Sequence, residues 1–126
     1  MEIAIVAHDA KKTDMLDFIK HNREVLMRED VNLIATGTTG SMAEDAGFTV
    51  RRMLSGPLGG DAQIAARVGE GKTGMVLFFK DPLGKHPHEP DINMLLRICD
   101  VHNVPLATNE ATAQMLIDAF KHRKEI

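Results

Sequence analysis

Five short apolar runs alternate with amphipathic segments along the chain, and this alternation limits the folds that it can adopt. The runs are Ile3–Ala7, Val31–Ala35, Val50–Leu54, Met75–Phe79 and Val104–Ala107. Strands that alternate with helical segments form βαβ units, in which the helices cover a parallel sheet. We therefore predict an α/β fold with a mostly parallel central sheet.

The segments between the runs have the spacing of amphipathic helices. We expect helices over residues 12–26, 41–46, 61–69 or 61–71, 92–103 and 111–120. Met75–Phe79 is the most hydrophobic run, so it should be the central strand, covered on both faces. Arg51 and Arg52 interrupt the third run, and we expect that strand nearer the edge of the sheet.

Length and composition argue against several classes of protein. A chain of 126 residues forms one domain, residues 1–126, with a substantial core. The formal charge of −3 and the absence of Trp and Tyr argue against a nucleic-acid partner. No apolar stretch reaches the roughly 20 residues that span a membrane, and the first strand begins too early for a signal peptide. The single cysteine, Cys99, fits a buried hydrophobe in the reducing cytoplasm.

Polar residues that can bind or react follow each run, where its strand should end. They are His8; Thr36, Thr38 and Thr39; Ser55 and Gly56; Asp81; and Thr108 with Asn109. Ligands of open parallel sheets bind outside the carboxyl ends of the strands. We therefore predict one site, assembled from loops at this edge of the sheet.

Two of these turns are suited to an anion. Residues 36–40, which include Gly37, offer hydroxyls and backbone N–H groups at the start of a helix, and Ser55-Gly56 offers more of the same. Lys12 adds a positive charge at the same edge. The alternative is that the threonines cap a helix and the glycines supply positive φ angles. By contrast, Gly71-Lys72-Thr73 lacks the first glycine of a P-loop and precedes a strand, so we interpret it as a plain turn.

Asp61 opens a predicted helix directly after Gly59 and Gly60. An Asp in this position is commonly the N-cap of the helix. The flexible glycines also allow the backbone to approach a ligand, and burial can make a carboxylate basic enough to abstract a proton. Both interpretations stay open on the residues alone.

The loop over residues 81–91 holds two histidines and three acids. His86, His88, Glu89 and Asp91 are potential metal ligands, although the intervening prolines hinder their convergence. The preferred interpretation pairs His88 with Asp91, whose carboxylate would fix the imidazole tautomer. The alternative leaves Asp91 as a helix cap and His88 on the surface. We expect His86 to be dispensable, because it lacks a carboxylate partner.

In these motifs the chain resembles the methylglyoxal synthase family. The matching segments are residues 5–9, 35–40, 53–63, 78–83, 87–91 and 105–109. They cover nearly the whole chain in the family's order, and the Gly-Gly-Asp and Pro-His-x-Pro-Asp segments are specific to it. The tail is shorter than in some members, which leaves regulatory or interface features at the C-terminus open.

The resemblance implies a cytoplasmic homohexamer with a three-layer α/β/α fold that converts dihydroxyacetone phosphate to methylglyoxal and inorganic phosphate without a cofactor or metal. Asp61 would be the general base. His88, oriented near Asp91, would bind the substrate oxygens and shuttle protons, and Asp81 would support them. The phosphate would rest on Lys12, Thr36, Gly37, Thr38, Thr39, Ser55 and Gly56, with His8 closing the opposite side. Inorganic phosphate, the product, would also be a candidate inhibitor.

Two other functions are compatible with parts of the sequence. Regulatory domains such as the allosteric domain of carbamoyl-phosphate synthetase resemble this fold and bind small anions without catalysis, but they do not need Asp61, His88 and Asp91 together. A metal-dependent hydrolase built on residues 86–91 is the more distant alternative, and loss of activity with a strong chelator would support it.

Overall fold

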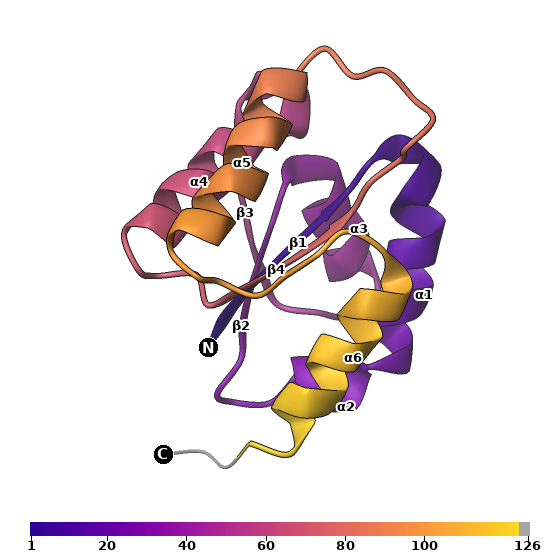
Figure 1. The fold of residues 1–126 in the computed structure, drawn as a ribbon. Coiled ribbons are helices and arrows are strands. Elements are labelled where there is room, and N and C mark those ends of the chain that lie inside the picture. The colour runs from indigo at the N-terminus through magenta and orange to yellow at the C-terminus, as the bar shows by residue number, and fades with distance from the viewer. Residues whose placement is uncertain (124–126) are drawn as a thin grey trace.

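The five apolar runs form one parallel sheet with the strand order β3-β2-β1-β4-β5 in the computed structural model, which describes residues 1–123 (Figure 1). The strands are β1 (Glu2–Ala7), β2 (Asn32–Ala35), β3 (Val50–Arg52), β4 (Met75–Phe79) and β5 (Leu106–Ala107). Each neighbouring pair is parallel, so the predicted α/β class is confirmed. The end of the predicted charged tail lies outside the described residues.

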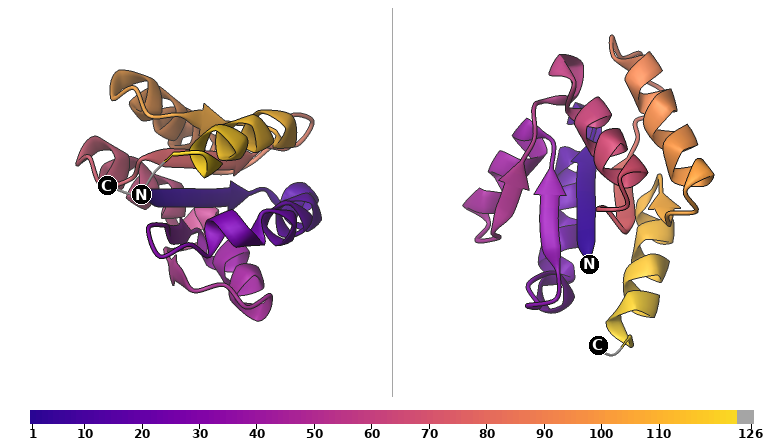
Figure 2. Two further views of the ribbon diagram at one scale, coloured as in Figure 1. Left: turned by 90° about the horizontal axis from the view of Figure 1, so that it is seen from below. Right: turned by 90° about the vertical axis from the view of Figure 1, so that its left-hand side faces the viewer.

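Helices cover both faces of this sheet and give a three-layer α/β/α domain (Figure 2). They are α1 (Lys12–His21), α2 (Arg23–Leu26), α3 (Gly37–Asp45), α4 (Gly60–Gly69), α5 (Glu89–Val101) and α6 (Glu110–Lys121), with short 3-10 turns η1 (Asp9–Lys11) and η2 (Gly56–Leu58). One apolar cluster joins α1, α2, α3 and α6 to the sheet, and a second joins α4 and α5 to its other face.

Strand β1 shows why the sheet is buried on both sides. Ile3 and Ile5 belong to the cluster with α1, α3 and α6, whereas Ala4 and Val6 belong to the cluster with α4 and α5. Side chains alternate between the two faces of a strand, so a run without polar residues is what a doubly covered strand requires. All five residues of β4 are buried in the same way, as predicted, but β1 and not β4 is the middle strand.

The predicted helix over residues 12–26 is divided at Asn22. The side-chain amide of Asn22 donates to the carbonyl oxygen of Phe18 and to Oε1 of Gln114, both at 2.9 Å, and Gln114 donates back to Oδ1 of Asn22. This partly buried pair links the end of α1 to α6. The sequence pattern does not reveal this break, which coincides with a contact to a helix 92 residues further along the chain.

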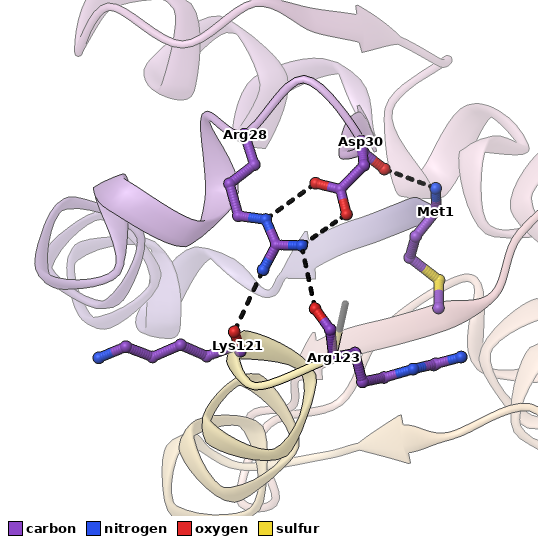
Figure 3. A network of polar contacts seen from close by, with 5 residues as sticks. All are labelled: Met1, Arg28, Asp30, Lys121 and Arg123. Atoms are coloured by element: carbon purple, nitrogen blue, oxygen red, sulfur yellow. Dashed lines mark hydrogen bonds and ion pairs between the residues drawn. The ribbon is translucent and has the colours of Figure 1, made fainter. Parts of the chain in front are cut away.

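The C-terminal helix is also held at its far end. Figure 3 shows the guanidinium of Arg28 between the carboxylate of Asp30, at 2.6 and 2.9 Å, and the carbonyl oxygens of Lys121 and Arg123. The N-terminal ammonium of Met1 donates to the carbonyl oxygen of Asp30 at 2.6 Å. These contacts tie the start of β1, the loop before β2 and the end of α6 together at the amino end of the sheet.

Within residues 1–123, no helix has the length and apolar character needed to cross a membrane.

Candidate active site

A cavity of about 560 Å³ lies at the carboxyl ends of β1, β2 and β4. Ten of the predicted site residues line it: His8, Lys12, Thr36, Thr38, Thr39, Ser55, Gly56, Asp61, Asp81 and His88. Gly37 and Asp91 are not in its wall. Thr108 and Asn109, which follow the edge strand β5, line a separate pocket with Lys11 and Lys80, so the prediction that all five strand ends share one site was wrong for β5.

One wall of the cavity is the first turn of α3. The predicted glycine-rich turn is in fact helical: α3 begins at Gly37, with Thr36 in the N-cap position. The N–H groups of Thr38 and Thr39 have no earlier turn of helix to donate to, so they are available to an anion. The hydroxyl of Thr39 is buried without a hydrogen-bond partner. This turn therefore presents unpaired donors to the cavity.

Gly37 contributes by allowing two loops to approach each other closely. Its N–H donates to the carbonyl oxygen of Leu54 at 3.2 Å, and a Cβ at Gly37 would stand 3.2 Å from the backbone nitrogen of Ser55. At Gly60 a Cβ would overlap the carbonyl oxygen of Leu54. The absence of a Cβ at Gly37 and Gly60 thus lets the segment after β3 pack closely against the start of α3. We call the surface that these two segments form the cradle.

Lys12 supplies positive charge to this cradle. It lines the cavity near the start of α1 and forms an ion pair with Asp9, whose side chain is almost fully exposed. The hydrogen bond from Lys12 lowers the pKa of Asp9. Because Asp9 faces solvent, its hold on Lys12 is weak, and an anion in the cavity can compete for the ammonium group.

Asp61 lies at the bottom of the cavity with no exposed surface. The structure places it in the first turn of α4 and gives the N-cap position to Gly59, whose φ of 107° favours glycine. Neither carboxylate oxygen has a hydrogen-bond partner. Burial raises the pKa of Asp61, the neighbouring Asp91 raises it further, and His88 opposes the rise. A buried, unpartnered carboxylate of raised pKa has the properties of a general base.

His88 faces Asp61 and not Asp91. Its Nε2 lies 3.5 Å from Oδ2 of Asp61, and its Nδ1 has no hydrogen-bond partner. The predicted imidazole pair with Asp91 is therefore wrong. The reason is that α5 begins at Glu89, which places His88 in the N-cap position outside the first turn that holds Asp91. Between these two residues the backbone alone is bonded, from the N–H of Asp91 to the carbonyl oxygen of His88 at 3.0 Å.

His8 is hydrogen-bonded to the segment that follows the neighbouring strand β4. The backbone N–H of Asp81 donates to Nδ1 of His8 at 2.8 Å, so the proton of the neutral ring belongs on Nε2. That Nε2 is buried and has no partner. Burial, together with the neighbouring His86 and His88, lowers the pKa of His8 to about 4. Near neutral pH, His8 is thus a neutral donor in the wall of the cavity.

His86 also lines the cavity, which the sequence reasoning did not foresee. Its ring stacks on that of His8, with centroids 3.7 Å apart and planes inclined by 19°. The sequence analysis considered only a carboxylate as a partner for His86 and did not predict this ring contact. No group of three or more His, Cys, Asp or Glu residues in the described part of the chain is arranged to hold a metal ion.

The segment Gly71-Lys72-Thr73 is a turn between α4 and β4, as predicted. Thr73 is buried and donates to the carboxylate of Glu2, which also accepts two hydrogen bonds from Arg67 at 2.6 and 2.9 Å. This network lies at the amino end of the sheet. It has a structural role, away from the cavity.

Comparisons with known proteins point to one family. The family described as MGS-like domain matches residues 14–108. The methylglyoxal synthase of Clostridium botulinum (strain Alaska E43 / Type E3) is 54% identical over 121 residues, which cover 95% of this chain and all of that protein. That of Carboxydothermus hydrogenoformans is 55% identical, covering 95% of this chain and 98% of the relative. The crystal structure of methylglyoxal synthase from Elizabethkingia anophelis NUHP1 superposes with a TM-score of 0.84 at 36% identity, covering 99% of this chain and 92% of that one.

Proposed function

Since the chain belongs to the methylglyoxal synthase family, we propose that Asp61 is the general base of its reaction. The enzyme is a carbon–oxygen lyase that converts dihydroxyacetone phosphate to methylglyoxal and inorganic phosphate. The observation that supports the role of Asp61 is its complete burial under the cavity with neither carboxylate oxygen hydrogen-bonded.

In the first step, the Asp61 carboxylate removes a proton from C1, the carbon that bears the hydroxyl group. The electrons of that C–H bond form a C1–C2 double bond, and the carbonyl oxygen on C2 takes the negative charge of an enediolate. A base whose pKa is raised by burial suits this step, because the protonated product is not penalised by desolvation.

His88 is placed to serve the oxygens of that enediolate. Its Nε2 lies beside Asp61, so both groups reach the same small region of the cavity. A hydrogen-bond donor that binds an oxygen more strongly as its negative charge develops in the transition state lowers the barrier. A donor that binds the substrate and the transition state equally does not. We assign to His88 the stabilisation of the oxygens on C1 and C2 and the transfer of protons between them.

Elimination then requires a particular orientation of the phosphate group. The C1 hydroxyl loses its proton as a carbonyl forms at C1, the double bond shifts to C2–C3, and the C3–O bond breaks with its electron pair on phosphate. The enol product takes up a proton at C3 and loses the proton of its C2 hydroxyl, which gives methylglyoxal. These shifts need the C3–O bond roughly perpendicular to the enediolate plane, so the cradle must fix a torsion angle as well as bind an anion.

The cradle residues are suited to that task. The phosphate oxygens would accept from the first turn of α3, from Ser55 and Gly56, from the ammonium of Lys12, and from Nε2–H of His8. Asp91 would act through its negative charge, which raises the pKa of Asp61. Asp81 would support His8 through its backbone N–H.

The test is an assay of the purified protein with dihydroxyacetone phosphate that follows methylglyoxal and inorganic phosphate together, with and without a strong chelator. We expect equal amounts of the two products and no effect of the chelator. Phosphate release without methylglyoxal, or activity that the chelator abolishes, would favour the metal-dependent hydrolase. Binding of phosphate without turnover would favour a regulatory domain.

We further propose a homohexamer in the cytoplasm, where a phosphorylated triose is available. Large apolar side chains exposed on the single chain support assembly: Leu58, at the end of η2, is 71% exposed, and Leu83, in the loop before α5, is 95% exposed. Light scattering coupled to size exclusion should give six times the 13.9 kDa chain mass. A monomer at working concentration would contradict the proposal.

A further inference from the structure

The stacked rings of His8 and His86 join two segments that are far apart in the sequence. His8 follows β1, and His86 lies in the loop between β4 and α5. The centroid distance of 3.7 Å and the inclination of 19° describe face-to-face contact. His88 meets both rings edge-on, with centroids 6.0 Å from His8 and 5.9 Å from His86. Three imidazoles thus form one packed cluster in the wall of the cavity.

The loop over residues 80–88 is attached to His8 at both of its ends. At its start, the N–H of Asp81 donates to Nδ1 of His8. Near its end, the ring of His86 covers one face of the same imidazole. Between these points the loop folds tightly: the carboxylate of Asp81 accepts from the N–H of Leu83 at 3.1 Å, and a Cβ at Gly84 would stand 3.2 Å from Nε2 of His86. These two contacts with the His8 ring therefore fix the position of the loop and of His88 at its end.

We propose that His86 is a positioning residue of this enzyme, which holds the ring of His8 and the loop that carries His88 in place by stacking. The inference deepens the proposed function and rests on it, because it assigns His8 to the phosphate and His88 to the enediolate. The stack acts through both His8 and His88. It keeps the Nε2–H of His8 aimed into the cavity, and it fixes the chain two residues before His88.

The charges around His8 are consistent with this role. Its ring faces His86, His88, Lys80 and Asp81 from the β4–α5 segment, and Asp9 adjoins it in η1. Removing the ring of His86 admits water to one face of His8 and removes a group that disfavours its protonation. The pKa of His8 should then rise from about 4 toward its ordinary 6.5.

The test compares His86→Ala, which removes the stack, with His86→Phe, which keeps an aromatic face but has no ring nitrogen. His102→Ala is the matched control, because His102 is an exposed histidine next to α5 and lies outside the cavity. The first readout is NMR of the imidazole nitrogens of His8 in the substrate-free protein, followed as a function of pH. The second is kcat/KM with dihydroxyacetone phosphate.

We expect His86→Ala to raise the pKa of His8 by at least about one pH unit and to lower kcat/KM about tenfold, since small misplacements of catalytic groups have effects of this order. His86→Phe should keep the Nε2–H tautomer of His8 and stay within about threefold of wild type. His102→Ala should match wild type in both readouts.

Two results would overturn the proposal: a His86→Ala protein with unchanged His8 signals and unchanged kcat/KM, or a His86→Phe protein as impaired as His86→Ala. The NMR readout needs no substrate. If the wild-type protein does not turn over dihydroxyacetone phosphate, the proposed function fails, and the stacking role is still decided by the His8 signals.

Discussion

Nε2 of His88 lies 3.5 Å from Oδ2 of Asp61, at the bottom of a cavity whose other walls carry hydroxyls, backbone N–H groups and a lysine. The two groups to which we assign proton exchange with the substrate are therefore adjacent before it binds. His88 also opposes the rise in the pKa of Asp61 that burial causes. We propose that this balance keeps the buried carboxylate available as a base. Four predictions concern these residues and the phosphate cradle.

Asp61→Asn should abolish catalysis while leaving substrate binding largely intact. The amide keeps the shape of the side chain but cannot accept a proton, so kcat should fall by roughly three orders of magnitude or more. Steady-state kinetics with dihydroxyacetone phosphate, together with calorimetric titration of phosphate, would separate the two effects. A variant within tenfold of wild-type kcat would remove Asp61 from the role of base.

The same substitution should stabilise the fold at neutral pH. The pKa of Asp61 is raised in the folded protein, so between its ordinary 3.8 and the raised value the folded state holds the proton and the unfolded state has lost it. Stability therefore falls as pH rises through that window. Removing the buried, unpartnered charge should raise the free energy of unfolding at pH 7 by on the order of 1 kcal/mol. Denaturant titrations should show this gain shrinking toward pH 4, whereas a pH-independent gain would contradict the explanation.

Gly56→Ala should displace His88. A Cβ at Gly56 would stand 2.7 Å from Nε2 of His88, closer than real contacts allow, so the imidazole must move away from Asp61. We expect kcat to fall about tenfold to a hundredfold with a smaller change in KM. Gly69→Ala, whose Cβ would meet only the end of His102 at 3.8 Å, is the matched control and should behave like wild type. Equal activity of the two variants would mean that His88 does not work from its observed position.

Thr39→Val should weaken phosphate binding without loss of stability. Its hydroxyl is buried and unpartnered, and Val has nearly the same shape, so the fold loses no hydrogen bond. KM should rise several-fold to about tenfold, and inhibition by inorganic phosphate should weaken in parallel. Thr73→Val makes the contrasting change, since Thr73 donates to Glu2 at the other end of the sheet. It should lower the melting temperature and leave KM unchanged, and the reverse pattern would refute the assignment of the cradle.

Much of the fold and the edge that carries the site could be predicted from the sequence. Apolar runs locate strands because a doubly covered strand admits no polar residue, and polar residues after those runs mark the carboxyl edge. The resemblance of the motifs identified the family. The prediction failed where long-range contacts decide the outcome, as at Asn22, whose partner is Gln114 on another helix.

The internal geometry of the site could not be predicted in the same way. The spacing of His88 and Asp91 suggested a pair, but the imidazole precedes the helix and lies over Gly56 instead. The stack of His86 on His8 depends on the path of an irregular loop, which local pattern does not determine. Such loops take their shape from the strands that they join, so their contacts emerge only in three dimensions.

Residues of the proposed site come from both helical layers. Lys12 and Thr39 come from α1 and α3 on one face of the sheet, whereas Asp61 and His88 come from the beginnings of α4 and α5 on the other. On the roles that we propose, part of the phosphate cradle and the proton-transfer pair thus rest on separately packed layers, and Gly56 brings the two together beside His88. Substitutions in α1 and α3 should accordingly alter phosphate binding more than they alter the environment of Asp61.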